Sequence, residues 1–175
     1  DKLLFEDLEL PHAKYNLKAS ADSFRLQVGL MVNKIRSILK KEKPDIVIVV
    51  GDTNSMLSGA LVANQLNITL GHVEAGLRSH DLTMLEETNR IIVDNISDLL
   101  FAPTINAKNN LTSERIDSNK IFITGNTVVD ALYQNIKIAE RKTNILNKLG
   151  LKPKNYIVLT AHRAENVDNK ERLEN

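Results

Sequence analysis

The sequence predicts an α/β fold built around a doubly wound parallel sheet. Short apolar runs rich in β-branched residues alternate with longer segments whose apolar residues recur every three or four positions. Glycine or proline separates several of these segments. Parallel strands need crossover helices, and helices in such folds cover both faces of the sheet, so the alternation predicts a layered α/β core.

The individual elements follow from these periods. Residues 22–43 are expected to form an amphipathic helix that ends at Pro44, because apolar side chains recur there with Lys and Arg between them. The continuous apolar run Asp45–Gly51 predicts a strand buried on both faces. The same reasoning predicts helices over 55–66, 86–97, 104–112 and 126–142, and strands over 68–73, 99–102, 121–124 and 156–160.

The pattern changes after Gly125 and suggests two domains. We expect a first α/β domain over 1–126, an interdomain helix and linker over 127–154, and the start of a second α/β domain over 155–175. The sequence begins at Asp1 without a methionine and stops at Asn175 inside a helix-like run, so we expect a fragment of a longer protein.

Composition excludes several classes of function. The chain has 175 residues, 42% of them hydrophobic, and its 23 Lys+Arg are balanced by 22 Asp+Glu that are interspersed with them. This charge pattern argues against a nucleic-acid partner, and no apolar run approaches the ~20 residues that span a bilayer. Cysteine is absent, which fits a cytoplasmic protein. No dinucleotide fingerprint, phosphate loop or H-E-x-x-H zinc motif occurs.

Polar residues follow every predicted strand. Ligands bind at the carboxyl ends of parallel strands, so these residues are the candidates for a site. They are Asp52–Ser55, Glu74, Pro103–Thr104, Gly125–Thr127 and His162–Asn166. Two carboxylates and an imidazole delivered to one edge are a set typical of acid/base chemistry.

Structural interpretations compete with this one. Asp52 or Thr53 could simply cap the following helix. In the segment Gly71–Ser79, Glu74 could form an incidental salt bridge with Arg78 at a glycine-bounded strand end.

The other titratable candidates also have structural alternatives. Glu86 and Glu87 open a helix, where acidic residues favour the dipole whatever their function. His162 could be structural, although adjacent Arg163 suits bidentate phosphate contacts. His12 and His80 are expected to be exposed.

Six motifs resemble the UDP-N-acetylglucosamine 2-epimerase family at family-like spacing. They cover nearly the whole chain from Leu8 onward. The matching segments are Pro44–Asn54, Gly71–Ser79, Glu86–Arg90, Phe101–Thr104, Thr124–Asp130 and Thr160–Asn166.

The resemblance implies a glycosyltransferase-B-like fold with two Rossmann-like domains and a UDP-sugar bound between them. This chain would hold most of the first domain and the start of the second. The implied reaction interconverts UDP-N-acetylglucosamine and UDP-N-acetylmannosamine by elimination and re-addition of UDP through 2-acetamidoglucal. It needs no metal and no nicotinamide cofactor, and the full-length protein is expected to be a homodimer.

The resemblance also assigns roles to residues. The implied catalytic residues are Asp52, Glu74, Glu86 and His162. Asp52 and Glu74 would transfer the proton, Glu86 would act electrostatically, and His162 with Arg163 would hold the pyrophosphate. The implied substrate-binding residues are Thr53, Arg78, Arg90, Asn126, Arg163 and Glu165.

The sequence leaves some alternatives open. It departs from the family at Leu85, where the family usually has proline, and over Ser20–Val28, which does not reproduce the family's allosteric Gln/Arg set. Alternatives are a hydrolysing 2-epimerase, an epimerase of a modified UDP-sugar, and a glycosyltransferase of the same fold. The isolated chain lacks family loops that bind UDP, so it is expected to be inactive.

Overall fold

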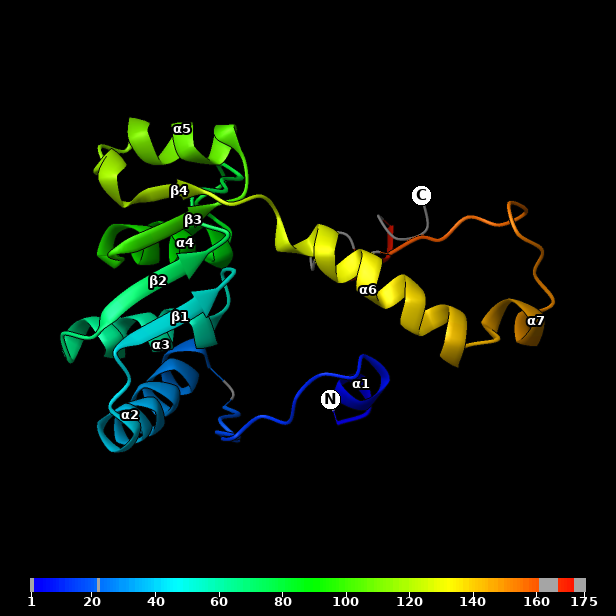
Figure 1. Cartoon of the computed structure of the whole chain (residues 1–175), viewed down its shortest axis with the longest axis horizontal. Helices are drawn as coiled ribbons and strands as arrows, with labels where there is room; N and C mark the ends of the chain where they lie inside the picture. Colours follow the sequence, from blue (N-terminus) through cyan, green and yellow to red (C-terminus); the bar gives the residue numbers. More distant parts are fainter. Residues whose placement is uncertain (1, 22, 161–166, 172–175) are drawn as a thin grey trace. The chain divides into compact units, whose positions relative to one another are not determined.

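The computed structural model describes residues 2–21, 23–160 and 167–171 (Figure 1). The predicted helices and first four strands form within one or two residues of their expected ends. In chain order the elements are α1 (Lys2–Asp7), α2 (Phe24–Glu42), β1 (Ile46–Val50), α3 (Asn54–Gln65), β2 (Thr69–Val73), α4 (Leu85–Ile96), β3 (Leu99–Ala102), α5 (Ile105–Ser113), the 3-10 turn η1 (Ser118–Lys120), β4 (Ile121–Ile123), α6 (Thr127–Lys142) and α7 (Ile145–Leu149).

The four strands form one parallel sheet in the order β1-β2-β3-β4. Val50 pairs with Val73, Val73 with Phe101, and Phe101 with Phe122, so one row of residues crosses the whole sheet. Because all strands run the same way, their carboxyl ends meet at one edge. The loops that carry the candidate residues therefore leave the sheet together.

Helices pack against one face of this sheet. Val49 and Leu70 point into a core with apolar residues of α3, among them Met56 and Ala60, and with Val93 of α4. A second cluster joins Leu100, Ala102 and Ile121 to Ala107 and Leu111 of α5. Helix α2 lies against α3 (Figure 1).

The opposite face of β1 is exposed, contrary to the expectation of a strand buried on both sides. Ile46, Ile48 and Val50 retain 41%, 48% and 56% of their accessible surface. The strand order explains this, because right-handed crossovers that all step in the same direction place every connecting helix on the same face. Helices on both faces require a reversal of strand order, which the described part of the chain does not contain.

Helix ends form where local chemistry favours them. Ser23 caps α2 by accepting a hydrogen bond from Leu26 N, and α2 ends where Lys43 adopts a left-handed conformation before Pro44. Thr53 and Thr104 cap α3 and α5 in the same way. The first helical turns after β1 and β3 are thereby fixed directly beside the strand ends.

The chain divides into the units Asp1–Tyr133 and Gln134–Asn175, and this division falls within α6. The domain boundaries expected from the sequence stay predictions. In the second unit the predicted strand over 156–160 does not form, and Ile157, Val158 and Leu159 are 95%, 81% and 87% exposed. A parallel strand needs a neighbour to bond with, and the described residues of this unit contain no other strand. No helix among the described residues is long and apolar enough to cross a bilayer.

Candidate active site at the strand ends

Backbone hydrogen bonds continue past the strands and fix the loops at the sheet edge. Gly51 N donates to Val73 O at 3.1 Å, and Ala75 N donates to Phe101 O at 3.3 Å. Each loop is thus bonded to the neighbouring strand before it turns away. Asp52 and Glu74 are therefore each next to a residue whose backbone is held by a hydrogen bond.

Asp52 is held from helix α4. Its side chain accepts a hydrogen bond from Arg90 Nη2 at 2.5 Å, and its carbonyl accepts one from Asn89 Nδ2 at 2.9 Å. Asp52 does not cap α3, because Thr53 does so with its hydroxyl oxygen 3.4 Å from Met56 N. The capping interpretation therefore applies to Thr53, and Asp52 keeps a partly exposed carboxylate at the edge.

Glu74 lies in a conformation that glutamate rarely adopts. Its φ is 72°, in the left-handed region, which costs a non-glycine residue of the order of 1 kcal/mol. A Cβ built on Gly51 would lie 3.8 Å from Glu74 Oε2, so this carboxylate faces the loop that carries Asp52. Glu74 makes no hydrogen bond among the described residues, which leaves both its oxygens available to a ligand.

The backbone after Glu74 is pressed against α5. Gly76 has a φ of 78°, and a Cβ there would lie 2.2 Å from Ala107 O. Gly76 N donates to Asp94 Oδ2 at 3.1 Å, and Gly76 O accepts from Asn110 Nδ2 at 2.9 Å. This close approach holds the unusual backbone of Glu74 in place.

His72 and Asp94 form a fully buried pair beneath the two loops. His72 Nδ1 lies 2.7 Å from Asp94 Oδ1, and His72 Nε2 lies 2.8 Å from Gly51 O. Asp94 Oδ2 accepts a hydrogen bond from Gly76 N and forms an ion pair with Arg78. Both ring nitrogens of His72 are thus engaged, one by a carboxyl oxygen and the other by a backbone carbonyl.

Arg78 completes this buried network. Its side chain is 1% exposed, and its guanidinium contacts Asp94 Oδ2 at 2.8 Å and donates two hydrogen bonds of 2.6 and 2.7 Å to Glu114. Burial alone lowers the pKa of Arg78, but the hydrogen bond with Glu114 and the charge of Asp94 outweigh it and raise the pKa. The expected alternative partner, Glu74, is not bonded to Arg78. This geometry gives Arg78 a supporting role and does not support its predicted contact with a substrate.

The two acidic residues at the start of α4 lie in different environments. Glu87 is 2% exposed and accepts hydrogen bonds from Ser79 N, Ser79 Oγ and His80 N. Burial raises the pKa of Glu87, but these hydrogen bonds and the charge of Arg78 outweigh burial and lower the pKa overall. Glu86 is exposed and makes no hydrogen bond among the described residues, so of the two it is the carboxylate that can meet a ligand.

The remaining predicted residues fall into two groups. Asn126 is exposed, and its Oδ1 accepts from Val128 N at 2.9 Å at the start of α6. His162, Arg163 and Glu165 lie outside the described residues. The expected exposure of His12 and His80 is confirmed.

Sequence reasoning missed the buried support. The sequence pattern does not point to Asp94, and it includes His72 only within the segment around Glu74. One signal could have revealed Asp94: Glu87, Arg90 and Asp94 recur at three- and four-residue spacing on α4, where an amphipathic helix would normally place apolar residues. All three are buried in the structure.

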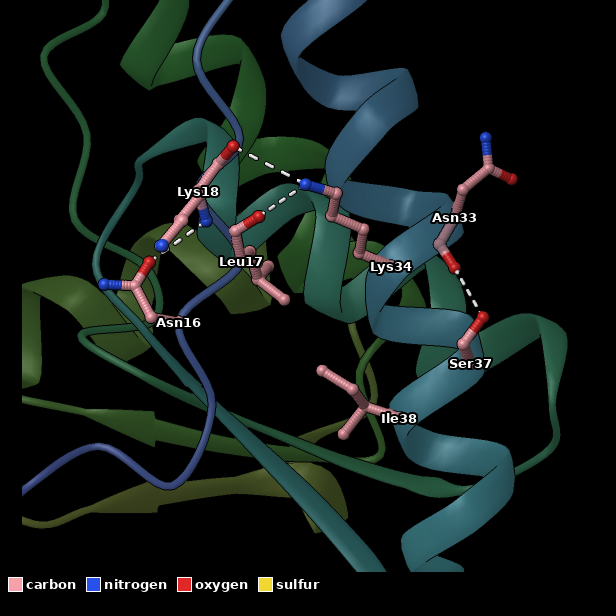
Figure 2. A pocket seen from close by; sticks show the side chains of 7 residues that line it. All are labelled: Asn16, Leu17, Lys18, Asn33, Lys34, Ser37 and Ile38. Atoms are coloured by element: carbon pink, nitrogen blue, oxygen red, sulfur yellow. Dashed lines mark hydrogen bonds between the residues drawn. The ribbon is translucent and has the colours of Figure 1, made fainter.

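Two other features bear on where a ligand could bind. Among the described residues no group of three or more His, Asp or Glu side chains could hold a metal ion. Figure 2 shows a pocket of about 590 Å³ between α2 and the segment before it, where Lys34 Nζ donates to Leu17 O at 2.6 Å. None of the candidate residues lines this pocket, so it is separate from the predicted site.

Comparison with known proteins decides the family. The family model described as UDP-N-acetylglucosamine 2-epimerase matches residues 1–175. The chain belongs to this family. The UDP-N-acetylglucosamine 2-epimerase of Methanocaldococcus jannaschii is 55% identical over 178 residues, covering 100% of this chain and 48% of the relative.

Other members of the UDP-N-acetylglucosamine 2-epimerase family agree. The UDP-2,3-diacetamido-2,3-dideoxy-D-glucuronate 2-epimerase of Pseudomonas aeruginosa is 39% identical over 175 residues, covering 98% of this chain and 48% of the relative. The crystal structure of the M. jannaschii epimerase in complex with UDP-GlcNAc and UDP matches 99% of this chain and 48% of that chain, with a TM-score of 0.90 and 55% identity. The chain thus spans about half the length of these relatives, and its predicted fold class is confirmed.

Proposed function

We propose that the full-length protein interconverts UDP-N-acetylglucosamine and UDP-N-acetylmannosamine without hydrolysis. The observation that carries the proposal is the pair of carboxylates, Asp52 and Glu74, at adjacent strand ends. Glu74 Oε2 faces Gly51, the residue before Asp52. Family membership and the 55% identity to the M. jannaschii epimerase point to the substrate class.

The chemistry explains why two carboxylates are needed. The C2 proton of the sugar has no neighbouring ring carbonyl to acidify it. Departure of UDP breaks the C1–O bond, and its electron pair leaves with the diphosphate. A carboxylate takes the C2 proton, and the C–H electrons form the C1=C2 bond of 2-acetamidoglucal. Epimerisation then requires a proton from the opposite face while UDP re-adds at C1.

Most of the proposed residue roles follow from the family resemblance, and the role of Arg90 follows from its ion pair with Asp52. Asp52 and Glu74 transfer the C2 proton, and exposed Glu86 stabilises developing positive charge electrostatically. Arg90 orients Asp52 by the ion pair between them, and Thr53 and Asn126 remain candidate substrate contacts. His162 and Arg163 are assigned to the UDP pyrophosphate, with Glu165 as a further substrate contact.

A second candidate is an epimerase of a more decorated UDP-sugar. The 39% identity to the P. aeruginosa 2-epimerase, whose named substrate carries two acetamido groups and a carboxylate, favours this reading. The hydrolysing branch differs in another way: water would replace UDP at C1, and free N-acetylmannosamine would leave.

Product analysis separates these functions. Full-length protein incubated with UDP-N-acetylglucosamine alone should yield UDP-N-acetylmannosamine, seen by proton NMR. A free sugar would contradict the non-hydrolysing reaction, whereas turnover only of a diacetamido uronate substrate would favour the second candidate. A requirement for an acceptor would point to a glycosyltransferase.

A further inference from the structure

The buried pair of His72 and Asp94 contacts the backbone beside both candidate carboxylates. On one side His72 Nε2 bonds the carbonyl of Gly51, the residue before Asp52. On the other side Asp94 Oδ2 accepts from Gly76 N, two residues after Glu74. Both side chains are 0% exposed, so neither can touch a substrate itself.

We infer that His72 is a positioning residue, which sets the direction of the Asp52 carboxylate by holding the Gly51 carbonyl. This role rests on the proposed function. The Gly51 carbonyl and the Asp52 nitrogen and Cα share one rigid peptide plane. Fixing the oxygen of that plane therefore fixes the point from which the Asp52 side chain leaves the backbone.

The bond matters because little else determines the rotation of this peptide. Gly51 has a φ of 79°, and glycine has the widest range of accessible backbone conformations. Its N–H is anchored to Val73 O, but the plane beyond its Cα can still turn. His72 Nε2 is the group that holds the carbonyl side of this plane, and Asn89 and Arg90 then hold Asp52 itself.

A purely structural role would give a different result on substitution. A buried ion pair can stabilise the fold without affecting the direction of any catalytic group. The two ring nitrogens of His72 make separate contacts, so two variants distinguish the roles. His72→Gln places an amide donor near the position of Nε2 and can keep the bond to Gly51, whereas His72→Asn places one near Nδ1 and can keep only the contact with Asp94.

The test measures epimerisation by the full-length enzyme and these variants. We expect His72→Asn to lower kcat by about 10- to 100-fold with KM within about twofold, since a small misplacement of a reacting group costs rate more than binding. His72→Gln should retain kcat within about fivefold of wild type. Ser97→Ala is the matched control, because Ser97 is equally buried and bonds only Val93 O through its hydroxyl at the far end of α4.

The outcomes decide the inference. Equal kcat for His72→Gln and His72→Asn, or losses that simply follow the thermal stability of the three variants, would overturn the positioning role while leaving the proposed function intact. Wild-type protein inactive on UDP-N-acetylglucosamine would overturn the proposed function and this role with it. If His72→Asn does not fold, soluble His72→Gln still decides, because a loss of kcat beyond about fivefold contradicts the inference.

Discussion

Arg90 Nη2 lies 2.5 Å from Asp52 Oδ2, and this ion pair joins helix α4 to the end of β1. The Arg90 side chain is 11% exposed and that of Asp52 29% exposed, so the contact forms at the boundary between core and solvent. Arg90 Nε is buried without a hydrogen-bond partner among the described residues. The ion pair with Arg90 limits where the Asp52 carboxylate can point.

Removing this partner should affect both rate and stability. Arg90→Met keeps much of the apolar stem but leaves Asp52 without its cation. We expect kcat to fall at least about tenfold and the free energy of unfolding to fall by about 1–3 kcal/mol. Steady-state kinetics and urea unfolding of the full-length protein measure the two effects. An unchanged kcat would show that Arg90 does not orient Asp52.

The two acidic residues of the first turn of α4 should respond differently. Glu86→Gln should lower kcat by about 10- to 100-fold and change the free energy of unfolding by less than about 0.5 kcal/mol, because its carboxylate is exposed. Glu87→Gln should instead cost about 1–3 kcal/mol of stability, since it removes a charged acceptor from three hydrogen bonds. Each variant is the control for the other. A loss of stability in Glu86→Gln and a loss of kcat alone in Glu87→Gln would contradict these roles.

The lowered pKa of Glu87 predicts a pH-dependent contribution to stability. The folded pKa lies below the usual value of 4.5, so the contribution is fully present above pH 4.5 and is lost as pH falls through the folded value. The difference in urea midpoint between wild type and Glu87→Gln should therefore be largest near neutral pH and shrink below pH 4.5. A difference that stays constant down to acid pH would mean that the charge of Glu87 does not stabilise the fold.

The loop after Glu74 should not tolerate a side chain at Gly76. Gly76→Ala combines a φ of 78° with a Cβ 2.2 Å from Ala107 O, so we expect a loss of at least about 3 kcal/mol or failure to fold. Gly125→Ala is the matched control, because its φ is 81° but nothing lies within 4 Å of an added Cβ. It should cost only about 1–2 kcal/mol. Similar unfolding midpoints for the two variants would contradict the close approach to α5.

Much of the fold could be predicted because its signals are local. The periodic apolar residues of α2, the Pro44 that follows it and the β-branched run of β1 specify their elements within a few residues of the chain. The exposed sheet face could not be predicted in this way, since it depends on strand order. The missing strand over 156–160 shows the same limit, because an apolar run becomes a strand only when a neighbour pairs with it.

The candidate site also combines features that local sequence signals predict with features that depend on long-range contacts. Asp52 and Glu74 can be predicted from the sequence because they directly follow apolar runs, and the structure brings their loops together. The left-handed φ of Glu74 and the bond from His72 to Gly51 depend on contacts between residues 18 to 34 positions apart. Such contacts leave no local pattern, so the support of the site became visible only in the fold.

The most direct test of the account is deuterium exchange at C2 of UDP-N-acetylglucosamine. Full-length wild-type protein, Asp52→Asn and Glu74→Gln would each be incubated with the substrate in heavy water and followed by proton NMR. Wild type should incorporate deuterium at C2 of both epimers, and each variant should exchange at least about 100-fold more slowly while unfolding as a single folded species. Near-normal exchange in either variant would contradict the assignment of that carboxylate to proton transfer.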